Sequence, residues 1–118
     1  MVLKYNKPPS QRQLQVAENI RHVLAEFFIR GELNHPYFDN VMITVSEVRI
    51  SPDLKIATAF LVLPIQSDKN EIIKVLRESS PHIRKAIAKR VQLRYLPEIR
   101  FALDESIERA AKINDLLK

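Results

Sequence analysis

The sequence predicts one domain of the α/β (α+β) class, with elements in the order α-β-β-α-α-β-α. Its 118 residues, 46% of them hydrophobic, are enough for one domain with one core. Apolar residues recur at three- and four-residue steps in some segments and at alternate positions in others, which separates helices from strands. Capping and turn residues stand between these segments and mark their ends.

The N-terminal part is predicted to be a flexible basic arm, residues 1–9, followed by a single domain, residues 10–118. The domain begins with a helix, because Ser10-x-x-Gln13 has the spacing of a capping box. A broad apolar stripe follows, and Gly31, the only glycine, stands where a left-handed cap would end the helix. The stripe comprises Val16, Ala17, Ile20, Val23, Leu24, Phe27 and Phe28.

Two strands follow, in residues 41–50 and 55–64. In the first strand, apolar residues occupy odd positions and then even positions, and this change of phase predicts a β-bulge near Ser46-Glu47. The Ser-Pro-Asp-Leu sequence of residues 51–54 is typical of a turn. The second strand is apolar on both faces over most of its length, so we expect it to be the central strand.

Two helices, a strand and a last helix are predicted in the second half. Asp68-x-x-Glu71 marks the start of the first helix. Ser79-Ser80-Pro81 then interrupts the pattern, because proline lacks the N–H that a helix interior needs but suits the first position of a helix. We expect a break at Ser80, a helix over about residues 81–92, a strand over 96–103 and a final helix over 105–117.

The composition argues against disulfide, metal and membrane chemistry. The chain has no cysteine, and His22, His35 and His82 lack the spacing of metal ligands. Its longest apolar run, residues 57–63 interrupted only by Thr58, is far shorter than the about 20 residues that cross a bilayer, and no secretory signal is visible at the N-terminus. We expect a soluble cytoplasmic protein, monomeric, with no metal, cofactor, small-molecule substrate or membrane partner.

Positive charge is concentrated in residues 81–100. The chain has a net charge of +5, and this segment alone carries six Lys or Arg residues against one acidic residue, Glu98. Lys and Arg release condensed counterions when they meet phosphates, so a concentrated basic surface favours a polyanionic partner. The alternative is a helix face whose charge only keeps the protein in solution.

Several segments occur in a distinctive order and spacing: Ser10-Gln11-Arg12, Thr44 to Val48, Ser51 to Lys55, Ile83-Arg84, Leu93 to Phe101, and Asp104. In these segments the chain resembles the ribosome-binding factor A family, over nearly its whole length. The most specific combination is the Ser-Pro-Asp-Leu turn with the later Leu-Arg-x-x-Pro-Glu-x-x-Phe segment.

The resemblance implies a type II KH-like fold with helices on one face of a three-stranded sheet. It also implies a non-catalytic factor that binds the small (30S) ribosomal subunit and assists late maturation and processing of 16S rRNA. KH domains clamp nucleic acid with a G-x-x-G loop between two helices, which a chain with one glycine lacks. The family replaces that loop with a kink, usually alanine-x-glycine, and both signature residues differ in the matching Ser79-Ser80-Pro81.

The candidate RNA- and ribosome-binding residues are all basic. Phosphate contact is expected from Arg84, Lys85, Lys89, Arg94 and Arg100, with Arg12 and Arg21 extending the surface. Two alternatives remain open. A general single-stranded RNA or DNA binder would need a glycine clamp or a row of exposed aromatic residues, and neither is evident. A protein–protein adaptor would bind with little dependence on salt. No convergent set of catalytic side chains is visible.

Overall fold

The computed structural model describes residues 8–33, 35–38 and 41–105. The predicted N-terminal arm, apart from its last two residues, and the predicted final helix, apart from Glu105, lie outside these ranges. Within them, no helix is both long enough and apolar enough to cross a membrane.

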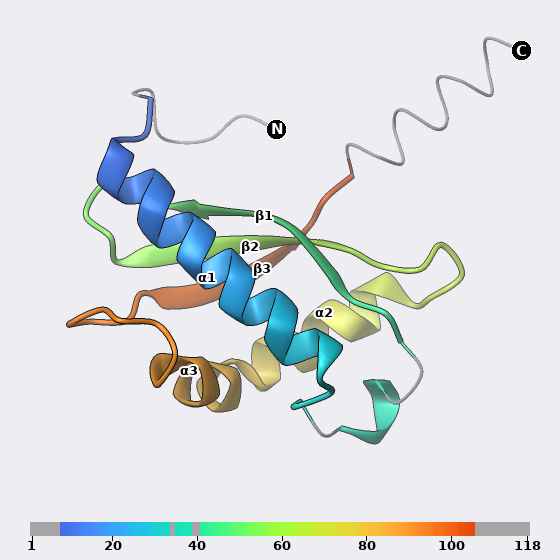
Figure 1. Cartoon of the computed structure of the whole chain (residues 1–118). Helices are drawn as coiled ribbons and strands as arrows, with labels where there is room; N and C mark the ends of the chain where they lie inside the picture. The colour runs from blue at the N-terminus through green and yellow to red at the C-terminus, as the bar shows by residue number, and fades with distance from the viewer. Residues whose placement is uncertain (1–7, 34, 39–40, 106–118) are drawn as a thin grey trace, which may run out of the picture.

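In the described residues, three α-helices, one short 3-10 helix and three strands follow one another in the predicted order (Figure 1). The α-helices are α1 (Gln11–Ile29), α2 (Lys69–Glu78) and α3 (Ser80–Ala88). The strands are β1 (Thr44–Ile50), β2 (Ile56–Val62) and β3 (Glu98–Leu103), and the 3-10 helix is η1 (Pro36–Phe38). Only η1, in the connection between α1 and β1, has no counterpart in the predicted order.

The sheet has the order β1-β2-β3, so the prediction of a central β2 is confirmed. β1 and β2 are antiparallel, whereas β2 and β3 are parallel. The predicted bulge is present, because the β1–β2 register shifts between Val45 and Glu47. Ser46, the extra residue, donates a hydrogen bond of 2.5 Å from its hydroxyl to Asp104 Oδ2, beyond the end of β3.

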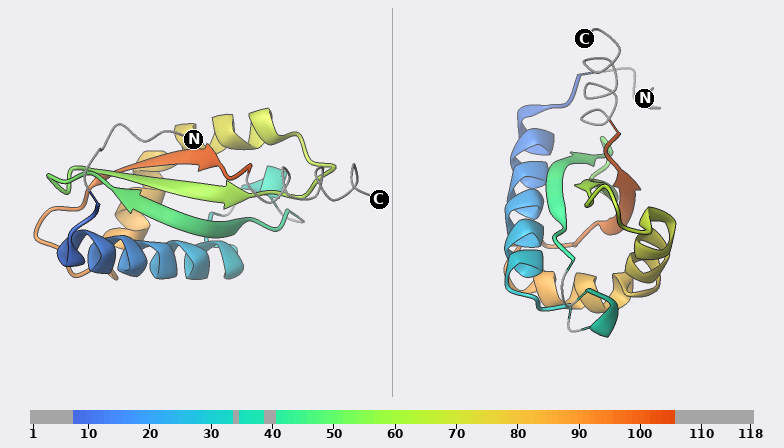
Figure 2. Two further views of the ribbon diagram at one scale, coloured as in Figure 1. Left: turned by 90° about the horizontal axis from the view of Figure 1, so that it is seen from above. Right: turned by 90° about the vertical axis from the view of Figure 1, so that its right-hand side faces the viewer.

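The helices cover one face of the sheet, as expected. Along β2, Ala57, Ala59 and Leu61 belong to the hydrophobic core, and along β3 Ile99 and Phe101 do so. The alternating residues of β3 are exposed or half-buried, because they lie on the opposite face. Figure 2 (left) looks onto that open face, with the three strands in front and the helices beside and behind them.

Both ends of α1 are capped as predicted. At the start, the Gln13 backbone N–H donates to Ser10 Oγ (3.1 Å) and the Ser10 N–H donates to Gln13 Oε1 (2.8 Å), which completes the capping box. At the end, Gly31 has a φ of +67°, and the N–H groups of Gly31 and Glu32 donate to the carbonyls of Phe28 and Phe27. These two bonds are a Schellman motif, which satisfies carbonyls that have no partner inside the helix.

The core is one cluster to which all three helices contribute. α1 packs on β1, and α2 and α3 pack on β3. Its largest fully buried side chains are Phe27, Ile20, Leu24, Leu61, Ile72, Leu76, Ile83 and Ile87. The apolar stripe that predicted α1 therefore faces this core, and the half-buried Phe28 packs against its edge.

The break between α2 and α3 exists, but two boundaries differ from the prediction. The break lies at Ser79 rather than Ser80, because Ser79 both caps α2 and accepts the first α3 hydrogen bond, from Ile83 N–H (3.0 Å). Pro81 then occupies the first turn of α3, where its missing N–H costs nothing. The helix ends at Ala88 rather than Gln92. The N–H of Arg90 donates to the carbonyl of Ile87, only three residues earlier, and this shorter step tightens the last turn.

Candidate nucleic-acid interface

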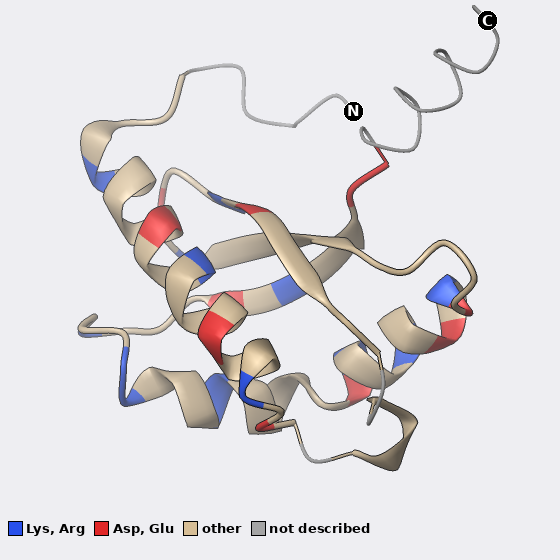
Figure 3. Cartoon of the chain, turned by 45° about the vertical axis from the view of Figure 1, so that its right-hand side comes forward, with Lys and Arg blue, Asp and Glu red and all other residues tan. Residues whose placement is uncertain are grey.

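The stretch from α3 to the start of β3 is the most one-sidedly charged part of the chain. No Asp or Glu occurs between Glu78 and Glu98, so cations on this stretch have no acidic neighbour in sequence. Figure 3 shows Lys and Arg positions on α3 and on the loop that follows it. This loop, residues 89–97, is called the α3–β3 loop below.

Two lysines of this stretch are free to bind a partner. Lys85 on α3 and Lys89 at its C-cap are both exposed. Neither has a hydrogen bond or ion pair to any residue that the structure describes. Both side chains are therefore accessible to a phosphate, as their choice as candidate contacts requires.

Arg94 lies in the α3–β3 loop beside an exposed aromatic ring. Its guanidinium carbon is 5.5 Å from the centre of the Tyr95 ring, within the range of a cation–π interaction. Tyr95 is 76% exposed. Arg94 therefore keeps its positive charge on the surface without a carboxylate partner among the described residues.

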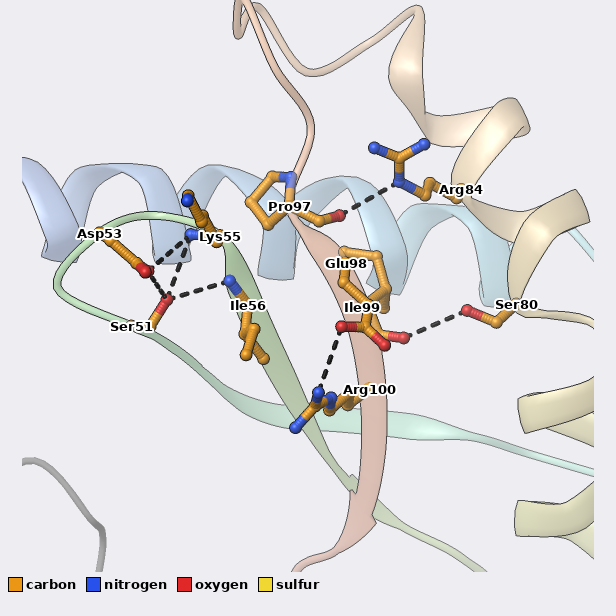
Figure 4. Close-up of polar contacts among 10 residues, drawn as sticks. All are labelled: Ser51, Asp53, Lys55, Ile56, Ser80, Arg84, Pro97, Glu98, Ile99 and Arg100. Carbon is orange, nitrogen blue, oxygen red and sulfur yellow. Dashed lines mark hydrogen bonds and ion pairs between the residues drawn. The ribbon is translucent and has the colours of Figure 1, made fainter.

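Arg84, another candidate phosphate contact, is exposed but also forms hydrogen bonds within the protein. Its Nη2 donates to the Leu96 carbonyl (2.6 Å) and its Nε donates to the Pro97 carbonyl (3.3 Å; Figure 4). Both acceptors lie immediately before β3. Arg84 thus fastens the end of the α3–β3 loop to α3, and periodicity along α3 gave no sign of this role.

Two further side chains bind carbonyls along the outer edge of β3. Ser80 Oγ donates to the Ile99 carbonyl (3.1 Å; Figure 4), and Arg77 Nη2 reaches the Phe101 carbonyl at 3.5 Å. They satisfy acceptors on an edge of β3 that has no neighbouring strand among the described residues. The residues that match the family kink therefore include one, Ser80, that holds the helix break against the sheet.

Arg100 is not part of the same cluster. It alternates along β3 with the core residues Ile99 and Phe101, so its side chain lies on the open face of the sheet. There it pairs with Glu98 at 3.2 Å. Arg49 of β1, on the same face, pairs with Glu47 at 2.8 Å. The charges of this face are therefore largely matched.

The two predicted arginines on α1 differ from each other. Arg12 is exposed and has no partner among the described residues. Arg21 donates to both carboxylate oxygens of Glu18, at 2.9 and 2.5 Å. The hydrogen bond from Arg21 lowers the pKa of Glu18 and raises the pKa of the arginine itself. Of the two, only Arg12 offers an unpaired charge.

One ion pair joins the ends of α1 and α3 and was missed by the sequence analysis. Arg90 Nη1 donates to Glu32 Oε2 at 2.7 Å, and Nη2 donates to Oε1. Both side chains are about two-thirds buried, at 32% and 28% exposed. The hydrogen bond from Arg90 lowers the pKa of Glu32. No sequence signal identifies the pair, because 58 positions separate the two residues.

The Ser51–Leu54 turn is explained by its own hydrogen bonds. The buried Ser51 hydroxyl accepts from the N–H groups of Lys55 (3.1 Å) and Ile56 (3.0 Å) and donates to Asp53 Oδ1 (2.6 Å; Figure 4). The hydrogen bond from Ser51, together with one from the Lys55 N–H to Asp53 Oδ1 (3.1 Å), lowers the pKa of Asp53. Leu54 takes the left-handed conformation, with a φ of 61°. Hairpin formation alone therefore accounts for this motif.

Nothing in the described part of the chain forms a metal site, since no group of three or more His, Asp or Glu residues is placed to hold an ion. Among the described residues, Lys85, Lys89 and Arg94 are the cations of α3 and its following loop whose side chains have neither an ion pair nor a hydrogen bond within the protein.

The amino-acid sequence of this chain matches one family of known proteins. The family model for ribosome-binding factor A matches residues 12–117. A ribosome-binding factor A of Pelagibacter ubique is 48% identical over 119 residues, covering 100% of this chain and 97% of its own. That of Zymomonas mobilis is 40% identical and covers 98% of this chain and 84% of its own.

Solved structures show the same fold. A solution structure of a Thermotoga maritima protein, described as a ribosome-binding factor A, superposes with a TM-score of 0.68 at 27% identity, over 87% of this chain and 96% of that one. A homology model of Thermus thermophilus ribosome-binding factor A, fitted into a cryo-EM map of its complex with 30S, gives a TM-score of 0.64 at 22% identity, over 79% of this chain and 96% of that one.

Proposed function

The chain belongs to the ribosome-binding factor A family, and from this premise we propose that it binds the small (30S) ribosomal subunit and assists the late maturation and processing of 16S rRNA. The role is one of binding, with no catalytic step. The Thermus thermophilus relative of the same fold, placed in a 30S complex, supports this proposal.

The observation that carries the proposal is the set of unpaired cations on α3 and the α3–β3 loop. Lys85, Lys89 and Arg94 lie in a stretch without acidic residues, and none of them has a carboxylate partner among the described residues. An unpaired surface cation binds a phosphate without first giving up an ion pair, so these three residues are the proposed core of the contact.

The other predicted contact residues take secondary places in the proposal. Arg12 has no partner in the described ranges and extends the surface along α1. Arg21 and Arg100 must exchange a carboxylate for a phosphate. Arg84 keeps donor groups to spare, because a guanidinium has five N–H donors and two of its nitrogens bind carbonyls. Its primary role in the proposal is to hold the α3–β3 loop.

The test is co-sedimentation of the purified protein with small subunits, large subunits and naked 16S rRNA over a series of salt concentrations. A triple variant (Lys85→Gln, Lys89→Gln, Arg94→Gln) is compared with Lys74→Gln, which removes an exposed, unpaired lysine of α2. Each lost phosphate contact lowers the slope of log affinity against log salt by about 0.7–0.9. We expect the triple variant to lower it by about 2–3 and the control to leave it unchanged.

The outcomes separate the alternatives. Selective binding to small subunits, weakened by salt and by the triple variant, supports the proposal. Equal binding to every RNA indicates a general nucleic-acid binder instead. Salt-independent binding indicates a protein–protein adaptor, and no binding to any of the three targets at low salt contradicts both RNA-binding functions. Circular dichroism confirms beforehand that each variant is folded.

A further inference from the structure

Tyr95 is an exposed aromatic residue that the fold does not use. It is 76% exposed, although large aromatic side chains are ordinarily buried for most of their area. Its hydroxyl has no hydrogen bond to the described part of the chain. Its ring contributes nothing to the hydrophobic core cluster. A ring in this state is available to a partner.

The backbone on either side of Tyr95 is held in place, although the ring itself is exposed. On either side of it, Leu93 and Leu96 pack against the core. Arg84 binds the carbonyls of Leu96 and Pro97, and the Glu98 N–H donates to the Lys55 carbonyl (2.8 Å). The backbone that carries Tyr95 is therefore held both by α3 and by the turn before β2, which lowers the entropy cost of binding through this residue.

The surroundings of Tyr95 suit nucleic acid. Arg94 lies over the ring, and Lys89 precedes Tyr95 by six residues, at most about 21 Å along an extended chain. Proteins that bind unpaired nucleotides combine a positively charged groove for the backbone with aromatic rings on which bases stack, and arginine adds cation–π contacts. A partner protein would also need acidic groups to match this stretch, whereas RNA supplies both its phosphates and its bases.

We propose that Tyr95, with Arg94 over its ring, is a stacking platform for an unpaired base of the small-subunit RNA. This inference rests on the proposed function and adds a residue that the charge pattern alone did not identify. Lys85, Lys89 and Arg94 bind phosphates, and Tyr95 stacks on one base beside them. Recognition of an unpaired nucleotide directs the protein to RNA whose local pairing is incomplete, since a base within a duplex is already stacked.

The first test measures the affinity of small subunits for Tyr95→Phe and Tyr95→Leu. Phenylalanine keeps the ring and loses the hydroxyl, whereas leucine keeps an apolar side chain without a π-face. Stacking of one base is worth a roughly five- to hundred-fold change in affinity. We expect Tyr95→Leu to lose affinity in this range and Tyr95→Phe to remain within about twofold of the wild type. Tyr37→Leu, in η1, is the matched control and should bind as the wild type does.

A second test reports on stacking directly. The chain has no tryptophan, so Tyr95→Trp introduces a single indole. Incorporated as 5-hydroxytryptophan, it is excited at wavelengths where the tryptophans of ribosomal proteins do not absorb. Stacking on a base quenches its emission. A Tyr37→Trp control places the same probe in η1, at the opposite end of the molecule from the α3–β3 loop (Figures 1 and 2).

The results distinguish a failure of this inference from a failure of the proposed function. Loss with Tyr95→Leu, retention with Tyr95→Phe and quenching only at position 95 support the stacking platform. If wild-type protein binds small subunits but Tyr95→Leu binds equally well, or Tyr95→Phe loses as much as Tyr95→Leu, stacking is wrong while the binding function stands. If wild-type protein does not bind small subunits, the proposed function itself fails, and the inference fails with it.

Discussion

α1 and the stretch from α3 to β3 both carry exposed basic residues, but they use them differently. On α1, Arg12 has no partner among the described residues, but Arg21 pairs with Glu18, and Arg30 at the C-cap pairs with Glu26 at 2.6 Å. On α3 and its loop, Lys85, Lys89 and Arg94 have no carboxylate within the part of the chain that the structure describes. Paired cations mainly shape the helix surface, whereas unpaired cations are available to a phosphate. The number of basic residues alone does not identify the binding surface.

The largest expected effect comes from removing two charges from each region in turn. We expect Lys85→Gln with Lys89→Gln to lower affinity for small subunits by at least about tenfold at physiological salt, because two phosphate contacts are lost. Arg21→Gln with Arg30→Gln should change it by less than about threefold, since both arginines are already paired. Co-sedimentation measures both. Equal losses in the two double variants would show that α1 is part of the contact to the same extent.

A second prediction compares neighbours within α3. Arg84→Met removes two hydrogen bonds to loop carbonyls and should lower the free energy of unfolding by about 1–2 kcal/mol. Lys85→Met, at the next position, removes no contact within the described structure and should stay within about 0.5 kcal/mol of the wild type. Urea unfolding followed by circular dichroism gives both values. An equally small change in Arg84→Met would mean that water replaces the two bonds at no cost.

A third prediction concerns the end of α1, which closes with a left-handed residue, whereas α3 ends without one. Gly31→Ala places a Cβ in open space, so only the positive φ is unfavourable. We expect a loss of about 1 kcal/mol in unfolding free energy. Gly31→Asn should lose less, because asparagine tolerates this conformation better. Thermal unfolding of the two variants checks the order, and a more stable alanine variant would contradict it.

The smallest effect is a dependence of stability on pH. It comes from Glu18 on α1 and Glu32 just after α1, whereas α3 carries no carboxylate. Hydrogen bonds from arginine hold the pKa values of Glu18 and Glu32 below that of an unfolded glutamate, about 4.3. The unfolded chain then binds more protons than the folded one as the pH falls below about 4.3. Stability from these pairs is therefore complete above that pH and is lost as the pH falls through the folded pKa values.

Measuring unfolding free energy between about pH 3 and 6 tests this prediction. The acid loss should be smaller in Glu32→Gln, because its pair no longer depends on ionisation. It should remain unchanged in Lys85→Gln, whose side chain binds no carboxylate in the described residues. If Glu32→Gln follows the wild-type curve, the Arg90 pair does not contribute to the acid dependence.

Elements that depend on local sequence could be predicted well. The capping box of α1, its glycine cap, the bulge at Ser46 and the central place of β2 each follow from residues close together in the chain. The end of α3 was wrong by four residues because Val91 is buried and so continues the helical pattern, although the backbone has already left the helix.

The candidate site was predictable only in part. The excess of charge in residues 81–100 and the exposure of Lys85 and Lys89 follow from composition and helical period. The bonds of Arg84 to loop carbonyls and the pair between Arg90 and Glu32 do not, because their partners are brought close only by the packing of α3 on β3 and α1. Tyr95 is one of three scattered tyrosines in the sequence, and only the structure shows that it is both exposed and beside a cation.

The parallel pairing of β2 with β3 has a consequence for how the chain folds during its own synthesis. A five-residue turn joins β1 to β2, so this hairpin forms from neighbouring residues, whereas β3 pairs with β2 only after residues 63–97 have been made. One edge of β2 therefore stays open while translation continues. We expect docking of β3 to limit the folding rate, and pulsed hydrogen exchange should protect the hairpin amides before those of β3. Until β3 has been synthesised, the open edge of β2 in a nascent chain can pair with a strand of another chain.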